Sequence, residues 1–174
     1  HRQSSAASDV YKRQPLYAAC KLRHEAIVRA LCGFESIDPN KAIDNSSYNM
    51  GWTPLHVAVS KGFYEIVETL LATEGIDVDQ ANHFSKTPLY LACEWKVDWY
   101  PENYVNIVQR LLEAGADPNI PDRYANTPLW RACSDGHHLR VKKLLEDPRQ
   151  IIDVNQVDGH YHTPLYVACA QNHY

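Results

Sequence analysis

The sequence predicts an all-α solenoid in which short helix-turn-helix units stack on one another and are joined by β-hairpin-like loops. A six-residue motif recurs along the chain, its copies are evenly spaced, and each copy that is followed by enough chain precedes a second apolar stretch with helical periodicity. The prolines of the motif stand at positions 15, 54, 88, 128 and 164, so successive copies are 39, 34, 40 and 36 residues apart. Repeats of this length are typical of units that bury their apolar faces against their neighbours.

Each residue type in the motif, Thr-Pro-Leu-x-x-Ala, has a structural reason. A threonine hydroxyl can cap the free N–H groups at the start of a helix. Proline suits the first helical position, where its missing N–H costs little. The leucine is expected to enter the core, and the alanine to let the next unit approach closely. The copies are Thr53–Ala58, Thr87–Ala92, Thr127–Ala132, Thr163–Ala168 and, without the threonine, one that begins at Pro15. We therefore expect a short first helix at each copy, from Pro15 to about Lys21 in the first unit and over about Pro54–Ser60 in the second.

The second helix of each unit is predicted from apolar residues at helical spacing. In the first unit the apolar stripe is Ala26, Ile27, Ala30 and Leu31, and in the second it is Ile66, Val67, Leu70 and Leu71. Gly62 is expected to form the turn between the helices of the second unit, and Gly75 to end its second helix. The connection between these units is about five residues longer than the next one, and turn-forming residues at 38–47 favour a surface loop.

The third unit departs from the pattern. Pro88 and Ile107 are 19 residues apart, whereas Pro54 and Ile66 are 12 apart. The seven extra residues, around 96–103, are expected to lengthen the turn between the two helices. This segment is rich in aromatic side chains, which either fold back and seal the core or stay exposed and anchor a partner. The aromatic residues concerned are Trp95, Trp99, Tyr100 and Tyr104.

The last two units and the first residues complete the predicted organisation. In the fourth unit Gly136 forms the turn, and the second helix carries Val141, Leu144 and Leu145. The fifth unit shows its first helix only. Residues 4–14 resemble the translation of a transposon-end adapter used in sequencing libraries. We therefore treat residues 1–14 as a non-native tail and expect the native N-terminus to be missing.

Composition argues against several classes of function. The net charge of −4 disfavours nucleic acid as the main partner, and no apolar run is long enough to cross a membrane. Five cysteines without a secreted-type framework favour a reducing compartment, and we expect an intracellular chain, cytoplasmic or nuclear. Four of them share one motif position, so we interpret them as small buried hydrophobic residues. They are Cys20, Cys93, Cys133 and Cys169.

No pattern indicates catalysis, a cofactor or a metal site. The sequence has no nucleophile elbow, no phosphate-binding loop and only 7 glycines. His160 and His162 with Asp158 are the nearest approach to a metal-ligand set. A pH-sensitive contact with a partner is the alternative for these histidines.

The recurring motif resembles that of the ankyrin repeat family from Pro15 to the C-terminus. The resemblance implies five repeats, at about 15–47, 48–81, 82–121, 122–157 and 158–174, the last one truncated. The family's fourth motif residue is a histidine that bonds backbone between neighbouring loops. Only His56 keeps it here, and Tyr17, Tyr90, Trp130 and Tyr166 stand in the other copies. Tyrosine and tryptophan could still donate a hydrogen bond from those positions.

The resemblance also implies a protein–protein interaction module that binds its partner through a concave face and hairpin fingers, with no obligate oligomer. Aromatic, Met and Arg side chains, which are enriched at binding hot spots, occupy the corresponding positions. Phe84 and Tyr124 could instead pack against neighbouring fingers. The expected partner contacts are Met50, Trp52, Phe84, Lys86, Leu91, Trp95, Trp99, Arg123, Tyr124, Asn126, Arg131, His160 and His162.

Two further hypotheses stay open at this point. The array could be the regulatory or targeting arm of a larger enzyme, such as a kinase or ubiquitin ligase, or of a channel whose other part lies outside this sequence. In addition, Asn119 and Asn155 resemble asparagines that are hydroxylated in ankyrin repeats.

Overall fold

The computed structural model describes residues 15–45, 49–94 and 101–172, so the predicted tail of residues 1–14 lies outside the described residues. The predicted all-α solenoid is confirmed, with one short antiparallel hairpin besides the helices. The elements are α2 (Pro15–Lys21), α3 (Glu25–Cys32), β1 (Ile43–Asn45), β2 (Asn49–Trp52), α4 (Pro54–Ser60), α5 (Tyr64–Leu71), α6 (Pro88–Glu94), α7 (Pro101–Glu113), α8 (Pro128–Ser134), α9 (His138–Leu145) and α10 (Pro164–Ala170).

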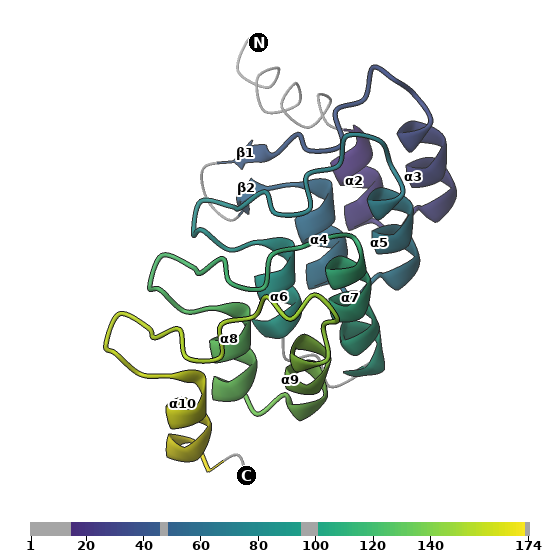
Figure 1. The fold of residues 1–174 in the computed structure, drawn as a ribbon. Coiled ribbons are helices and arrows are strands. Elements are labelled where there is room, and N and C mark those ends of the chain that lie inside the picture. The colour runs from purple at the N-terminus through teal and green to yellow at the C-terminus, as the bar shows by residue number, and fades with distance from the viewer. Residues whose placement is uncertain (1–14, 46–48, 95–100, 173–174) are drawn as a thin grey trace.

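The helices form two parallel rows (Figure 1). The inner row contains the first helix of each unit, α2, α4, α6, α8 and α10, and the outer row contains α3, α5, α7 and α9. Every helix packs against its counterpart in the next unit of its row. The loops between units project to one side of the inner row, as Figure 1 shows. The core therefore runs as a continuous strip between the two rows.

Threonine caps start the inner helices, as the motif predicts. The hydroxyl oxygen of each motif threonine accepts a hydrogen bond from the backbone N–H three residues later, over 3.1–3.3 Å. Such a cap contributes about 1 kcal/mol to the stability of a helix. The four caps are Thr53, Thr87, Thr127 and Thr163.

The outer helices confirm the predicted apolar stripes in the middle of the array but not at its ends. Ile66, Val67 and Leu70 are at most 1% exposed. In α3, however, Ile27 is 51% exposed and Val28 is fully buried, so the predicted stripe is wrong for the first unit. Leu145 of α9 is likewise 51% exposed. Both helices end the described outer row, so an outer neighbour covers each of them on one side only.

The described parts of both predicted insertions include regular secondary structure where the sequence predicts a surface loop or a lengthened turn. In the first, β1 pairs with β2 in an antiparallel hairpin. In the second, α7 has 13 residues where the other outer helices have 8. With Ile107 aligned to Ile66, residues 101–104 extend the helix at its N-terminal end and Glu113 adds one residue at its C-terminal end. The prediction of a longer turn is therefore wrong for these residues. The rest of the insertion, including Trp95, Trp99 and Tyr100, lies outside the described residues.

Tyr104, on the added part of α7, seals the core. Its side chain is 1% exposed, and its hydroxyl donates to the carbonyl oxygen of Ser60 over 2.9 Å. The ring lies against Gly62, where an added Cβ would come within 3.2 Å of it. Gly62 also has φ of +67°, a conformation that favours glycine. The turn of the second unit is thus shaped to receive this ring from the third.

Arg140 is a buried charge in the core. It occupies the α9 position that Ile66 holds in α5, and it is 4% exposed. Its guanidinium lies 4.9 Å from the centre of the Tyr104 ring, and its Nη1 donates to the carbonyl oxygen of Cys93 over 3.3 Å. Burial lowers the pKa of Arg140. The apolar pattern gave no indication of this residue, because an arginine interrupts it.

The burial of each motif cysteine depends on where its unit lies in the inner row. Cys20 and Cys93 are buried, and burial raises the pKa of both thiols to about 12. Cys133 is half-buried, whereas Cys169 on the terminal helix α10 is exposed. The interpretation as small buried side chains is confirmed for Cys20 and Cys93 and is wrong for Cys169.

Truncating Tyr104 is expected to destabilise the fold strongly. Replacing a buried aromatic side chain by alanine costs about 3–5 kcal/mol, which lowers Tm by roughly 10 °C in a chain of this size. Tyr104→Phe removes only the hydrogen bond to Ser60 and should cost about 1 kcal/mol. Thermal unfolding followed by circular dichroism measures both effects.

Tyr161→Ala is the matched control, because Tyr161 is 87% exposed. Its unfolding free energy should change by less than about 0.5 kcal/mol. Equal losses for Tyr104→Ala and Tyr161→Ala would show that Tyr104 does not seal the core.

The terminal helix α10 is expected to exchange its amide hydrogens faster than the central helices. It packs against α8, and Leu165 and Tyr166 are 73% and 55% exposed. Local opening costs less free energy where few apolar contacts are lost. Hydrogen exchange followed by mass spectrometry should show early labelling of 164–172 and late labelling of α5. Equal protection of the two helices would contradict this expectation.

Candidate functional site

Three finger loops, residues 82–87, 122–127 and 158–163, lie at the start of the third, fourth and fifth units. Each begins with an Asn or Asp whose Oδ1 accepts hydrogen bonds from the backbone N–H groups two and four residues later, over 2.8–3.1 Å. The fourth residue of each finger loop has a positive φ of 58–65°. These side-chain bonds supplement the backbone bond that closes each loop, in which the N–H of its first residue donates to the carbonyl oxygen of its fifth over 2.9–3.1 Å. The three first residues are Asn82, Asp122 and Asp158.

Backbone hydrogen bonds tie the finger loops to one another. The N–H of Arg123 donates to the carbonyl oxygen of Phe84 over 3.2 Å, and the N–H of Gly159 donates to that of Tyr124 over 3.1 Å. These bonds bring the third residues of the three loops, Phe84, Tyr124 and His160, into one row. The row of side chains is therefore held in place by backbone contacts.

The fourth motif position connects each inner helix to a finger loop in two of the units. The Nδ1 of His56 accepts from the N–H of Thr53 over 3.2 Å, so its Nε2 carries the proton and donates to the carbonyl oxygen of Lys86 over 3.0 Å. The Tyr90 hydroxyl donates to Oδ2 of Asp122 over 2.9 Å. Tyrosine thus replaces histidine in the third unit by bonding the side chain of the loop.

In the last two units the aromatic residue at the fourth motif position makes other contacts than His56 does. The indole nitrogen of Trp130 is buried without a hydrogen-bond partner among the residues that the structure describes. Tyr166 stacks on the ring of His162, with 4.5 Å between the ring centres and 5° between the planes. His162 in turn lies 3.2 Å from Oδ2 of Asp158. Neither aromatic residue therefore reproduces the bond that His56 makes.

Arg123 stands between two of the predicted contact residues. Its guanidinium carbon lies 4.5 Å from the centre of the Phe84 ring and 5.0 Å from that of Tyr124, and its Nη2 donates to the Tyr124 hydroxyl over 3.0 Å. Tyr124 is nevertheless 59% exposed, and Arg123 is exposed as well. Arg123 thus bridges the rings of two neighbouring fingers, and the Tyr124 ring faces solvent whereas Phe84 is half-buried.

Two other predicted contacts are cations that already have partners within the chain. Lys86 Nζ lies 2.6 Å from a carboxylate oxygen of Glu94, and Arg131 Nε lies 2.8 Å from Oδ2 of Asp135. Leu91 is only 2% exposed, so the expectation that it faces a partner is wrong. It belongs to α6, which α4 and α8 cover from both sides. These residues shape the inner surface without offering a free charge or an open apolar face.

The remaining predicted contacts vary in their exposure. Trp52 is half-buried, with its ring centre 6.4 Å from that of His56, and Asn126 is half-buried within its finger loop. His160 is exposed. The backbone of Met50 pairs within the β1–β2 hairpin, but its side chain lies outside the described residues, as do Trp95 and Trp99.

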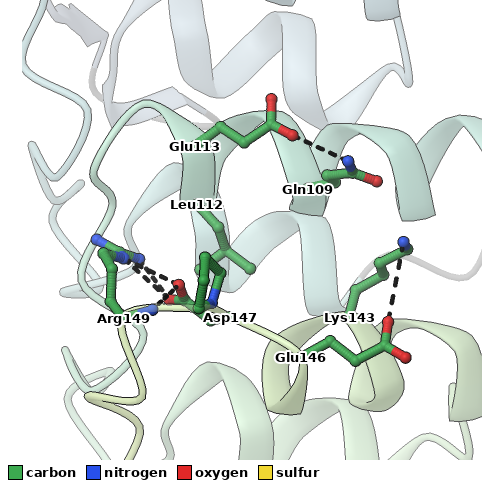
Figure 2. Close-up of a pocket in the computed structure, with 8 residues that line it drawn as sticks. Gln109, Leu112, Glu113, Lys143, Glu146, Asp147 and Arg149 are labelled. Carbon is green, nitrogen blue, oxygen red and sulfur yellow. Dashed lines mark hydrogen bonds and ion pairs between the residues drawn. The ribbon is translucent and has the colours of Figure 1, made fainter.

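A hollow of about 570 Å³ separates the second and third finger loops, and its lining includes Arg123, Tyr124, Trp130 and His160. A second hollow, of about 450 Å³, lies between the ends of α7 and α9 in the outer row (Figure 2). There Arg149 pairs with Asp147 over 2.6 Å, which lowers the pKa of that carboxyl group. Lys143 and Glu146 also pair with each other, so the second hollow has its charges internally compensated (Figure 2).

Asn119, one of the two asparagines with a predicted modification, joins neighbouring units. Its Nδ2 donates to the carbonyl oxygen of Ile151, and its Oδ1 accepts from the N–H of Asp153, each over 2.7 Å. Asn40 makes the equivalent pair of bonds two units earlier in the chain, to Gly75 and Asp77. The hydroxylation of Asn119 or Asn155 stays a prediction.

Within residues 15–45, 49–94 and 101–172, no cluster of three or more His, Cys, Asp or Glu side chains is arranged to hold a metal ion. His162 instead pairs with Asp158, and the ring centre of His160 lies 6.0 Å from that of His162. In the same part of the chain no helix has the length and apolar character needed to span a bilayer.

Comparison with known proteins gives a consistent result. A family model of ankyrin repeats matches residues 3–82, 41–122 and 95–174. "Ankyrin repeat, SAM and basic leucine zipper domain-containing protein 1" of Rhinolophus ferrumequinum is 38% identical over 96 residues, which cover 53% of this chain and 19% of that protein. The putative ankyrin repeat protein YahD of Escherichia coli is 40% identical over 98 residues, covering 56% of this chain and 48% of YahD. The matches thus span less than half of either relative.

The buried His56 is expected to make the fold less stable in acid. Burial lowers its pKa to about 4, whereas an unfolded histidine titrates near 6.5. The unfolded chain therefore binds the proton more readily, and up to about 3 kcal/mol of stability is lost as the pH falls from about 6.5 to about 4. Urea unfolding at about pH 7 and about pH 4.5 measures this loss.

His56→Gln separates this histidine from the other titrating groups. Glutamine can still donate to Lys86 but does not titrate, so the variant should lose less stability between the two pH values than the wild type. Identical losses would show that His56 does not carry this part of the pH dependence.

Proposed function

Because the chain belongs to the ankyrin repeat family, we propose that it is a protein–protein interaction module with no catalysis of its own. Ankyrin repeats are generally modules of this kind. The observation that carries the proposal is the row of finger loops, in which Phe84, Arg123, Tyr124 and His160 are fixed by backbone bonds beside a hollow. Aromatic and arginine side chains held in place lose little conformational entropy on binding.

The partner is proposed to lie across the finger loops and the adjoining inner helices. A repeat array offers an extended surface rather than a closed pocket, which suits a protein ligand better than a small substrate. Tyr124, 59% exposed and central among the three loops, is the proposed anchor. The fold itself names no partner, since one architecture can carry many functions.

A second proposal places the same surface in a larger protein. The printed name of the mammalian relatives combines ankyrin repeats with SAM and basic leucine zipper domains, so such arrays occur beside other domains. The chain could serve in the same way as the regulatory or targeting arm of an enzyme or channel. We also propose an intracellular location, since thiols such as Cys20 and Cys93 suit a reducing compartment.

Site-specific photo-crosslinking tests where a partner binds. A photoreactive phenylalanine analogue at Tyr124 should capture a defined polypeptide in cells that express the chain. The same analogue at Leu139 should not capture it, because Leu139 is 46% exposed on α9 in the outer row. Mass spectrometry identifies the captured protein, and circular dichroism checks that both variants fold. Capture of the same polypeptide from both positions, or from Leu139 alone, would contradict the proposed surface.

A further inference from the structure

We propose that the finger loops bind an extended, acidic segment of the partner protein, and that Arg123 pairs with a carboxylate of that segment. The inference rests on the proposed function and adds the chemistry of the partner. It follows from the way in which the finger loops distribute their charges.

The acidic side chains of the finger loops are turned inward. Asp122 and Asp158 are the only carboxylates within residues 82–87, 122–127 and 158–163, and they are 5% and 7% exposed. Oδ1 of each accepts two backbone N–H groups of its own loop. Oδ2 of Asp122 accepts from Tyr90, and Oδ2 of Asp158 pairs with His162. The outer surface of the three loops is therefore free of exposed negative charge, although the whole chain carries −4.

Arg123 is the cation that remains available on this surface. Lys86, in the neighbouring loop, has both oxygens of Glu94 within 2.8 Å of its Nζ. Arg123 is exposed, and its Nη2 donates to a neutral hydroxyl, that of Tyr124. Among the described residues no carboxylate pairs with it. Its remaining N–H groups can therefore bind a carboxylate of a partner.

The rings of Phe84 and Tyr124 hold the guanidinium plane in position before any partner arrives. A fixed guanidinium presents parallel donors that match the two oxygens of a carboxylate, and such bidentate pairs are stronger than single hydrogen bonds. Lysine in this place would offer a point charge without that geometry. The arrangement therefore favours arginine specifically at position 123.

The hollow beside Arg123 favours an extended ligand. It opens between the loops 122–127 and 158–163, and its wall includes Tyr124 and Trp130. A segment that crosses the loops would place a carboxylate at Arg123 and its neighbouring side chains in this hollow. Aromatic and cationic side chains also suit single-stranded RNA, but a net charge of −4 and a single unpaired arginine on the loops favour the peptide.

Fluorescence anisotropy with the whole chain tests the proposal. The probes are short labelled peptides that alternate Gly with Glu, Gln or Lys, and a labelled oligouridine. We expect the Glu peptide to bind at least about threefold more tightly than the Gln peptide, and the Lys peptide and the RNA to bind more weakly still. Added salt should weaken binding of the Glu peptide, because screening acts on exposed ion pairs.

Variants at Arg123 assign the effect to this residue. Arg123→Ala should weaken the Glu peptide about tenfold, and Arg123→Lys should recover only part of the loss. Lys142→Ala, which removes one positive charge from the exposed face of α9, should leave the affinity within about twofold. Thermal unfolding confirms that each variant is folded.

The outcomes separate this proposal from the function on which it rests. Equal affinity for the Glu and Gln peptides, an unchanged affinity in Arg123→Ala, or a preference for RNA would overturn the acidic ligand. If the photoreactive analogue at Tyr124 still captures a polypeptide, the proposed interaction module is supported and only the proposed acidic ligand is contradicted. If the chain neither prefers the Glu peptide nor captures a polypeptide at position 124, both proposals are overturned.

Discussion

No unit of this chain can bury its apolar residues alone, and the rest of the structure depends on that constraint. The inner helices have 7 residues and most outer helices have 8, and helices of this length are marginal in water without tertiary packing. Stability therefore comes from contacts between units, such as those of Val67 and Leu70 with their neighbours in the core. Where a neighbour is absent from the described residues, as beside α10, large apolar side chains such as Leu165 are exposed.

The need to provide hydrogen-bond partners for backbone N–H groups also shapes the surface of the finger loops. A loop that lacks a β-ladder must find acceptors for its backbone N–H groups, and here Asp122 and Asp158 provide them. Each carboxylate is thereby drawn inward and bound by its own loop. The residues that remain on the outside include no carboxylate and do include Arg123, so the charge of the proposed binding surface is a consequence of how the loops fold. Folding and recognition use the same residues for different purposes.

The sequence predicted the regular features because short-range chemistry determines them. The threonine caps, the proline starts and the apolar stripe of α5 each depend on residues within one or two helical turns. Contacts between residues far apart in the sequence could not be predicted in this way. The Tyr104 hydroxyl bonds Ser60, 44 positions away, and the Arg140 guanidinium bonds Cys93, 47 positions away. Leu91 was misjudged for a related reason, since packing between units covers its motif position, where Val57 and Val167 are likewise only 2% and 7% exposed. The tips of the finger loops were located correctly, but which charges are already paired within the chain, as Lys86 is, was visible only in three dimensions.

The extended α7 changes how the outer row supports the finger loops. In a simple array each unit contacts its neighbours through apolar packing, which tolerates small sliding movements between units. Here the Tyr104 hydroxyl fixes the third unit to the second, and Arg140 fixes the fourth unit to the third while it stacks on the same ring. These polar contacts are directional and buried, so they specify one spacing between the units. The first two finger loops belong to the third and fourth of these units, and the hydrogen bond from Arg123 to Phe84 requires that spacing to hold. The insertion in the outer row therefore helps to hold Arg123 between its two rings on the opposite side of the molecule.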